Sequence, residues 1–487
     1  MTRRSLVPVT LLLLASICAS AETRHPNAVT RTELMAWLAG GISNTRISQL
    51  LVERGLGFSF STIDEKQLRA AGAESSLIKT VRGLRRAVGN ENEPCLATLA
   101  STAELANQKH FELAEAQLRE LLRSNPGNAN LHFVLGEVLR QQEQWDDALD
   151  EFTESARLMP GFPETHNRLA YIFYREEDSD STIAEARTAL SIDPKNAEAY
   201  RYLGLGLYSV GKYDAALHAY EESLTREPEN AAVYYDMGIA LHDRGDQHGA
   251  MVSYRHALRL KPDFWEAHSN LGIVLHDLGR LDEAIAEYRE AKRLAPQQSS
   301  IRNNLGNTYC DKGDYDSAIA EFRELFKLDA GWESGHACMA KALMAKKNYE
   351  EAITQLRLAV RQNPTGASEH RVLGQALLLT GHPDAALPEL QAAVYLAPDS
   401  AIGHHYLGTA FFELQSLQDA EKEFREAIRL EPTAQNHYSL AACLMAMDRN
   451  DEALAQLEIA SHLDPAQNLY RARKEELLKA MAPKTTR

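Results

Sequence analysis

One pattern of 34 residues recurs along most of this chain and limits what the chain can fold into. Residues 265–296, WEAHSNLGIVLHDLGRLDEAIAEYREAKRLAP, contain two short stretches of amphipathic helical periodicity joined by a tight turn. The same residue types return in phase in both directions from this stretch. A period of this length indicates a repeat architecture, in which each unit stacks on its neighbours along one axis.

The columns of the repeat explain how each unit closes. With Trp265 as the first position, the eighth and twentieth positions are small, and a proline ends almost every repeat. Small residues let two antiparallel helices approach closely, while large residues at positions seven, eleven and twenty-four, such as Leu271, Leu275 and Tyr288, fill the space on either side. Proline cannot continue a helix, so it ends the second helix. The pattern predicts an all-α fold of about eleven helix–turn–helix repeats.

A helix–turn–helix of this length with these columns resembles the tetratricopeptide repeat family. The resemblance covers residues 95–465 and implies a right-handed α-solenoid, a superhelix with a concave face. The first repeat departs from it with Thr102 at position eight, and the third with Thr182 at position twenty and an acidic turn at 176–178. Residues 466–487 are expected to form a capping helix and a tail.

The repeats around residues 254–262 also resemble those of O-linked N-acetylglucosamine transferase, in which a catalytic domain follows the repeats. Only 22 residues follow Pro465 in this sequence. The resemblance therefore carries no expectation of that activity.

The first 21 residues have the features of a secretion signal. Arg3 and Arg4 precede an apolar run at 6–17, and Ala-Ser-Ala at 19–21 forms a cleavage site. We therefore expect export to the periplasm or the exterior, with a mature chain that begins at Glu22. A membrane anchor is the alternative, although the run is short for a span. A lipoprotein modification at Cys18 is disfavoured, because Ile17 stands where that signal needs a small residue.

Residues 22–94 are expected to form a small helical module and a linker ahead of the repeats. Thr30 and Glu33 have the spacing of a capping box, and Ser43 opens a second helix that ends at Gly55. Apolar residues near 68 and at 77–84 indicate two more helices, and 89–94 reads as the linker. The stretch VERGLGFSF followed by LRAAGA resembles a module found ahead of repeats in some exported bacterial proteins.

Composition and motifs disfavour several classes of function. A net charge of −16 argues against a nucleic-acid partner, whose phosphates call for clustered Lys and Arg. The sequence has no GxSxG, no HExxH, no glycine-rich phosphate loop and no closely spaced pair of cysteines. We therefore predict no enzymatic activity and no cofactor, and we expect free thiols instead of disulfides or a zinc site.

Seven of the 17 histidines recur at the fourth position of the repeat. Metal sites need clustered side chains, whereas a column supplies one ring per repeat, so a structural role is favoured. These histidines are His132, His166, His268, His336, His370, His404 and His437.

Family geometry places positions two, five, nine, twelve and thirteen of each first helix on the concave side, which we call the inner face. Position thirteen gives an acidic ladder, Asp243, Asp277 and Asp311, with His242 and His276 beside it at position twelve. Rings on such a face supply contact area and charges fix the register of a bound segment. The candidate partner-binding residues are Asn167, Tyr171, Tyr174, Arg175, Arg201, Tyr208, Tyr235, His242, Asp243, His276, Asp277, Asn307, Asp311, Arg371 and His405.

These features predict a non-catalytic scaffold that holds an extended peptide or a partner helix on the inner face, within a cell-envelope assembly. The acidic ladder favours a basic or amide-rich partner, although a solvated helix face would also explain it. No repeat has Lys at position five, so the carboxylate grip that some family members use for chaperone tails is not expected. After signal cleavage we expect no membrane span, and the sequence does not encode the oligomeric state.

Two alternatives stay open. One is an accessory subunit for the synthesis or export of an envelope glycan or polysaccharide, suggested only by the likeness to the transferase repeats. The other is a metal-responsive binder that uses His242 and His276.

Overall fold

The computed structural model describes residues 28–58, 60–84, 105–106, 108–332 and 335–481. In these residues the chain forms 26 α-helices and one isolated β-bridge, between Val29 and Leu56. The expected signal segment 1–21, the linker 89–94 and Thr102 lie outside the described residues. None of the described helices is long and apolar enough to cross a membrane.

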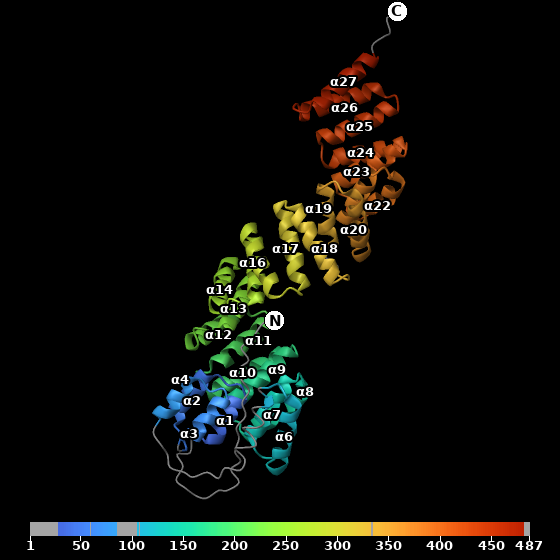
Figure 1. Cartoon of the computed structure of the whole chain (residues 1–487). Helices are drawn as coiled ribbons and strands as arrows, with labels where there is room; N and C mark the ends of the chain where they lie inside the picture. The colour runs from blue at the N-terminus through green and yellow to red at the C-terminus, as the bar shows by residue number, and fades with distance from the viewer. Residues whose placement is uncertain (1–27, 59, 85–104, 107, 333–334, 482–487) are drawn as a thin grey trace, which may run out of the picture. The chain divides into compact units, whose positions relative to one another are not determined.

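The chain divides into two compact units, residues 1–267 and 268–487, and the division falls inside α15. Colours and labels identify the helices of each unit (Figure 1). The first compact unit holds α1 (Arg31–Ala39), α2 (Asn44–Arg54), α3 (Thr62–Ala70), α4 (Ser75–Gly83), α6 (Phe111–Ser124), α7 (Ala129–Gln141), α8 (Trp145–Leu158), α9 (Pro163–Arg175), α10 (Ser179–Ile192), α11 (Ala197–Ser209), α12 (Tyr213–Arg226), α13 (Ala231–Asp243) and α14 (Gln247–Leu260).

From α15 onwards the same alternation of first and second helices continues. Consecutive helices pack as pairs from α7 and α8 to α25 and α26, which confirms the predicted all-α solenoid of helix–turn–helix repeats. The remaining helices are α15 (Trp265–Asp277), α16 (Leu281–Leu294), α17 (Ser299–Lys312), α18 (Tyr315–Leu328), α19 (Gly335–Ala345), α20 (Tyr349–Gln362), α21 (Ala367–Leu379), α22 (Pro383–Leu396), α23 (Ala401–Glu413), α24 (Leu417–Leu430), α25 (Ala434–Ala446), α26 (Asn450–Leu463) and α27 (Asn468–Met481).

The small eighth position meets the large twenty-fourth position directly. A Cβ atom added at Gly204 would lie 2.4 Å from the ring of Tyr220, and one at Gly272 would lie 2.7 Å from the ring of Tyr288. Both rings are buried. Glycine at position eight therefore creates the space for an aromatic ring of the second helix. The sequence predicted that the large residue at position twenty-four packs beside the small one, whereas the ring lies directly over the glycine.

The histidines at position four join the two helices of each repeat. In all seven, Nδ1 lies 2.6–2.7 Å from a side-chain oxygen 19 residues further on, such as Glu151 for His132 and Gln355 for His336. In His132, His370 and His404, Nε2 also lies 2.9–3.1 Å from the carbonyl oxygen of the preceding repeat's terminal proline. The predicted structural role of this column is confirmed, because each ring is held by an acceptor of its own repeat.

This geometry predicts a pH dependence at His132. Burial lowers the pKa of His132, but the hydrogen bonds to Glu151 and to the Pro126 carbonyl oxygen outweigh burial, and the pKa is raised. A raised pKa in the folded state means that the stabilisation is complete below the unfolded value of about 6.5 and is lost as the pH rises through the folded value. We expect Glu151→Gln to destabilise the first compact unit by about 1 kcal/mol more near pH 5.5 than near pH 8.5, because a charged acceptor becomes a neutral one.

Thermal unfolding of the full chain at the two pH values measures this difference. Glu120→Gln, at an exposed position of α6, is the matched control, with equal melting at both pH values relative to the parent. An equal loss at both pH values for Glu151→Gln would contradict a protonated His132.

Candidate functional site

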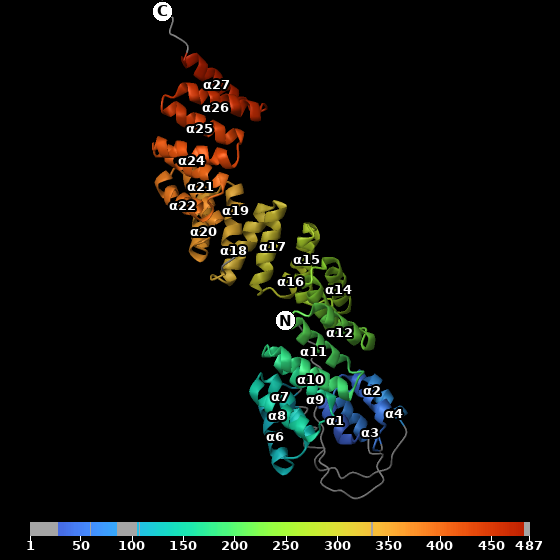
Figure 2. The ribbon, with the colours of Figure 1, turned by 180° about the vertical axis from the view of Figure 1, so that it is seen from behind.

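The helices of the N-terminal module cover the inner face of the first repeats. In both views the group α1–α4 lies next to the first repeats, and α1 packs against α7 (Figure 2). The predicted capping box at Thr30 and Glu33 is present at the start of α1. Residues from Val29 in the module to Ile172 in α9 form one hydrophobic core. The ring of Trp37 stacks on that of Phe162, with 6.0 Å between centroids.

A close approach at Gly40 fixes how the module docks. A Cβ atom at this position would lie 2.0 Å from the ring of Phe133, which is fully buried at position five of its repeat. Phe133 thus fills, with an apolar ring, a column that the sequence assigned to the partner-binding face. The face is already occupied here, and its occupant belongs to the same chain.

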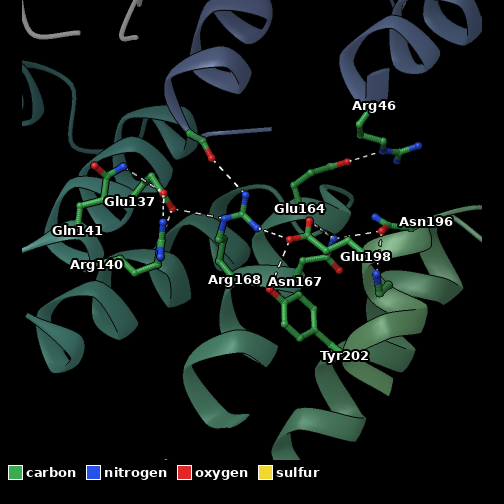
Figure 3. A network of polar contacts seen from close by, with 12 residues as sticks. Arg46, Glu137, Arg140, Gln141, Glu164, Asn167, Arg168, Asn196, Glu198 and Tyr202 are labelled. Atoms are coloured by element: carbon green, nitrogen blue, oxygen red, sulfur yellow. Dashed lines mark hydrogen bonds and ion pairs between the residues drawn. The ribbon is translucent and has the colours of Figure 1, made fainter. Parts of the chain in front are cut away.

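A buried polar network joins the module to three repeats (Figure 3). Arg168 donates to the carbonyl oxygen of Gly40 at 3.3 Å and to Glu198 at 2.9 Å, and it lies 3.4 Å from Glu137. Burial opposes ionisation of Glu137, but Arg140 and Arg168 hold the pKa of its carboxyl group below the usual value. The two guanidinium groups are always charged, and they keep the buried Glu137 carboxylate ionised.

Arg46 of α2 makes a second charged link. Its guanidinium pairs with Glu164 at 2.9 Å and with Asp193, which lie near the beginning and the end of the same repeat. Glu164 is 1% exposed. One module side chain therefore bridges α9 and the turn before α11.

The structure corrects the expectation that Asn167 is open to a partner. Its side chain is fully buried and donates to Asn196 at 3.1 Å and to Glu198 at 3.2 Å. It belongs to the network that seats the module. The sequence signal for this burial was Phe133 at the equivalent position of the preceding repeat, where a solvated groove would carry a polar residue.

Most other predicted residues of the first compact unit contact neighbouring repeats. Arg201 pairs with Asp236 at 2.6 Å, and Tyr208 donates a hydrogen bond to Asp243. Burial and the bond to Asp243 raise the pKa of Tyr208, so its hydroxyl stays protonated as a donor. Of the others, Tyr171 packs against the ring of Trp145 and Tyr235 against that of Phe264. Arg175 lies over the ring of Trp145, and the charge of Asp236 acts on Tyr174.

In the second compact unit, a row of charges crosses the ends of α15, α17 and α19. His276 lies 3.0 Å from Asp311 and 3.6 Å from Asp277, and Lys341 lies 3.4 Å from Asp311. The acidic column is thus partly neutralised by neighbours on the same face. Lys341 was not among the predicted residues.

A cavity of about 690 Å³ opens between α19 and α21, with α20 contributing to its wall. Most of its lining residues are at positions of the predicted inner face, which places a hollow on that face in the second compact unit. Arg371 is the only predicted site residue in its lining. The lining consists of Ala337, Cys338, Lys341, Met344, Ala345, Tyr349, Leu356, Ser368, Glu369, Arg371, Val372, Gln375 and Leu379.

The helices on either side of the cavity carry the two other predicted residues. On α17 the carboxamide oxygen of Asn307 is buried and accepts no hydrogen bond within the described residues. On α23 His405 packs against the rings of Tyr406 and Phe424. Burial lowers the pKa of His405, which keeps its ring neutral. A buried acceptor without a donor is rare in folded proteins and is a reason to look for a ligand.

Comparison with known proteins identifies the fold family. Models described as Tetratricopeptide repeat match residues 99–163, 203–254, 266–330, 303–367, 339–401 and 405–468, and a model described as TPR repeat matches 239–279. Together they cover more than half of the chain. The chain belongs to the tetratricopeptide repeat family.

Solved structures of other tetratricopeptide repeat proteins resemble parts of this one. Pseudomonas aeruginosa pilF is 22% identical, with 46% of this chain and 98% of that chain covered and a TM-score of 0.38. YrrB, described as having an unusual peptide-binding site, is 22% identical over 40% of this chain and 97% of that chain, with a TM-score of 0.33. MamA is 22% identical over 34% and 92%, with a TM-score of 0.32. No curated protein sequence matches.

In this tetratricopeptide repeat protein, the described residues show neither a metal-holding cluster nor a thiol with a lowered pKa. The described residues contain no group of three His, Cys, Asp or Glu that could hold a metal ion. Burial raises the pKa of Cys310 to about 12 and that of Cys443 to about 11, so neither thiol is an activated nucleophile. What the inner face presents instead is a hollow with amide, cationic and apolar side chains.

The sequence missed most of the cavity lining for a specific reason. The predicted site residues were charged, amide or aromatic. Met344, Ala345 and Leu379 are apolar residues at positions twelve and thirteen, so they were not among them. Two successive repeats with apolar residues there were the available signal, because a solvated helix end would be polar.

Proposed function

We propose that this protein is a non-catalytic binding scaffold that holds an extended segment or a helix of a partner protein on the inner face of its second compact unit. The observation that carries the proposal is the cavity between α19 and α21, lined at inner-face positions by both polar and apolar side chains. A concave site with a few polar groups on an apolar wall is the usual form of a binding pocket.

The polar groups suit a peptide. An extended segment brings one donor and one acceptor per residue, and these need partners once water is displaced. Gln375 and Ser368 of α21 supply amide and hydroxyl groups in the lining, and Asn307 of α17 carries a further amide on a flanking first helix. The apolar residues of the same wall supply area for side chains.

We do not propose that the partner is basic, although the sequence favoured a basic partner. That expectation depended on Asp243, Asp277 and Asp311, and each of these has a partner within the protein: Tyr208 for Asp243, His276 for Asp277, and His276 with Lys341 for Asp311. An acidic residue that is already paired gains less from an incoming cation.

Site-specific photocrosslinking tests the scaffold. With benzoylphenylalanine in place of Leu379, which is 52% exposed in the cavity lining, we expect a discrete crosslinked partner from an envelope extract. The matched control is the same substitution at Tyr395, which is 86% exposed on the second helix α22. Equal capture at both positions would contradict a binding site on the inner face.

We also propose that the protein works in the cell envelope, on the basis of the signal-like residues 1–21. Mass spectrometry of the protein recovered from an expressing bacterium is expected to find a mature N-terminus at Glu22 in the exported fraction. An intact Met1 in a cytosolic fraction would sink this part. Neither the glycan-related alternative nor the metal-responsive one gains a supporting observation from the described residues, so neither is proposed.

A further inference from the structure

The cavity wall consists of two parallel stripes. One runs along α19 through Ala337, Lys341 and Ala345, and the other along α21 through Arg371, Gln375 and Leu379. Residues four apart lie on one side of a helix, so each stripe is about 12 Å long at 1.5 Å per residue. Both stripes run from a polar or small beginning to an apolar end.

The cationic part of the wall contains a guanidinium group that forms no ion pair within the described residues, that of Arg371. Arg371 is partly buried. Arg371 acts on Tyr406 of α23: burial raises the pKa of the Tyr406 hydroxyl, and the positive charge of Arg371 opposes that rise. A partly buried guanidinium without a carboxylate is unusual, because desolvation is then uncompensated.

The one acidic residue of the lining lies in the first turn of a helix. Glu369 is in the first turn of α21, and a Cβ atom at Gly366 would lie 2.3 Å from its Oε2. A carboxylate at a helix N-terminus interacts favourably with the free backbone N–H groups there. Lys341 is shared with Asp311 at 3.4 Å. The charge left over in the cavity is therefore positive, and it is centred on Arg371.

The other end of the wall is apolar. Met344 and Ala345 end α19, Leu379 ends α21, and Tyr349 with the buried Leu356 of α20 lies behind them. Leu379 is 52% exposed, which leaves an apolar surface open to a ligand. A complementary ligand has an anion at one end and an apolar group one to two helical turns away.

We propose that this cavity binds an internal segment of a partner protein in which an acidic side chain lies near an apolar one. The carboxylate pairs with Arg371, and the apolar side chain packs on Met344 and Leu379. An internal segment fits because the first helices α17 and α23 contact the cavity helices on both sides, so the bound chain can continue in either direction. This inference rests on the proposed function, since it names the chemistry of the partner at the same site.

Selection from a peptide library tests the chemistry. The full-length protein is presented with bead-bound nonapeptides of random sequence, acetylated at the N-terminus and amidated at the C-terminus, so that any carboxylate comes from a side chain. We expect enrichment of Asp or Glu together with Leu, Ile, Phe or Met. Enrichment of Lys and Arg, or an acidic preference that appears only in a parallel library with free C-termini, would overturn the inference.

Variants locate the contact. For a selected peptide, Arg371→Gln is expected to weaken binding about tenfold, measured by fluorescence polarisation. Arg357→Gln, which removes the same charge from an exposed position of α20, should leave affinity unchanged. Replacing the peptide's acidic residue by its amide should have no further effect on Arg371→Gln, because the two changes remove one interaction. Additive losses would show that the carboxylate lies elsewhere.

Leu379→Arg separates the two levels of the proposal. Because Leu379 is half exposed, this change blocks the cavity without removing a buried contact. If Leu379→Arg abolishes selection but Arg371→Gln has no effect, the scaffold stands and the acidic preference fails. If the library yields no peptide that depends on Leu379, the proposed site itself fails.

Discussion

Replacing Arg168 with methionine is expected to destabilise the first compact unit by about 3–5 kcal/mol, because the buried Glu137 and the partly exposed Glu198 each lose an ion pair and the Gly40 carbonyl group loses its donor. Arg168 is 8% exposed and interacts with Glu137, Glu198 and the Gly40 carbonyl oxygen. Methionine has a long, flexible apolar side chain, so the change removes the charge and leaves little cavity. Glu137 keeps Arg140, whereas the Gly40 carbonyl group loses the guanidinium that docks α1 on α9.

Hydrogen exchange and chemical denaturation of the full chain measure the effect. We expect the amides of α1–α4 to exchange faster in Arg168→Met than in the parent, since the module loses a contact with the repeats. The control is Arg157→Met, whose exposed ion pair with Glu154 is worth at most about 1 kcal/mol. If the two variants unfolded alike, the network would not be what holds the module in place.

The contacts within each repeat could be predicted from the sequence, because the same pair of residue types occurs at the same two positions in many repeats. Gly204 faces Tyr220 in one repeat and Gly272 faces Tyr288 in another, so the same physical requirement appears as a column. The histidine column is predictable for the same reason, although its acceptors, such as Glu151 and Gln355, were not foreseen. Periodicity therefore identifies the positions that have a structural role, but it does not identify the residues that they contact.

The N-terminal module docks at one place only. Its contacts therefore produce no residue type that recurs at one position of the repeat. Arg46 and Glu164 are 118 residues apart, and nothing in the spacing of either predicts their contact. Gly40 and Phe133 are likewise joined only in the folded chain. The wrong expectation for Asn167 follows from this: the position was assigned correctly to the inner face, but the face was covered by a segment with no periodic signal.

The cavity lies between these cases. Arg371 was predicted from its column, while Lys341, Met344 and Leu379 were not. Residues that recur at one position of every repeat reveal the shared packing. A binding site is instead formed where neighbouring repeats carry different residues at the same position. The change from Asp277 and Asp311 to Ala345 and Leu379 at position thirteen marks the cavity, because charge gives way to apolar surface there.

Replacing Leu271 with alanine is expected to destabilise the second compact unit by about 2–5 kcal/mol. Leu271 is 1% exposed at position seven of α15, and the adjacent Gly272 faces the ring of Tyr288. The change removes buried methyl groups and leaves a cavity that the close helix crossing cannot collapse, since the ring already fills the space above Gly272.

The loss should also spread beyond its own repeat. Each repeat is stabilised by the interface with its neighbours, so faster hydrogen exchange is expected in α16 and α17 as well as in α15. Leu463→Ala, at a position that is 48% exposed, deletes the same atoms from the surface and should change stability by less than about 1 kcal/mol. An unfolding curve for Leu271→Ala that matched the parent would contradict the assignment of position seven to the core. Protection lost in α15 alone would instead contradict the coupling between repeats.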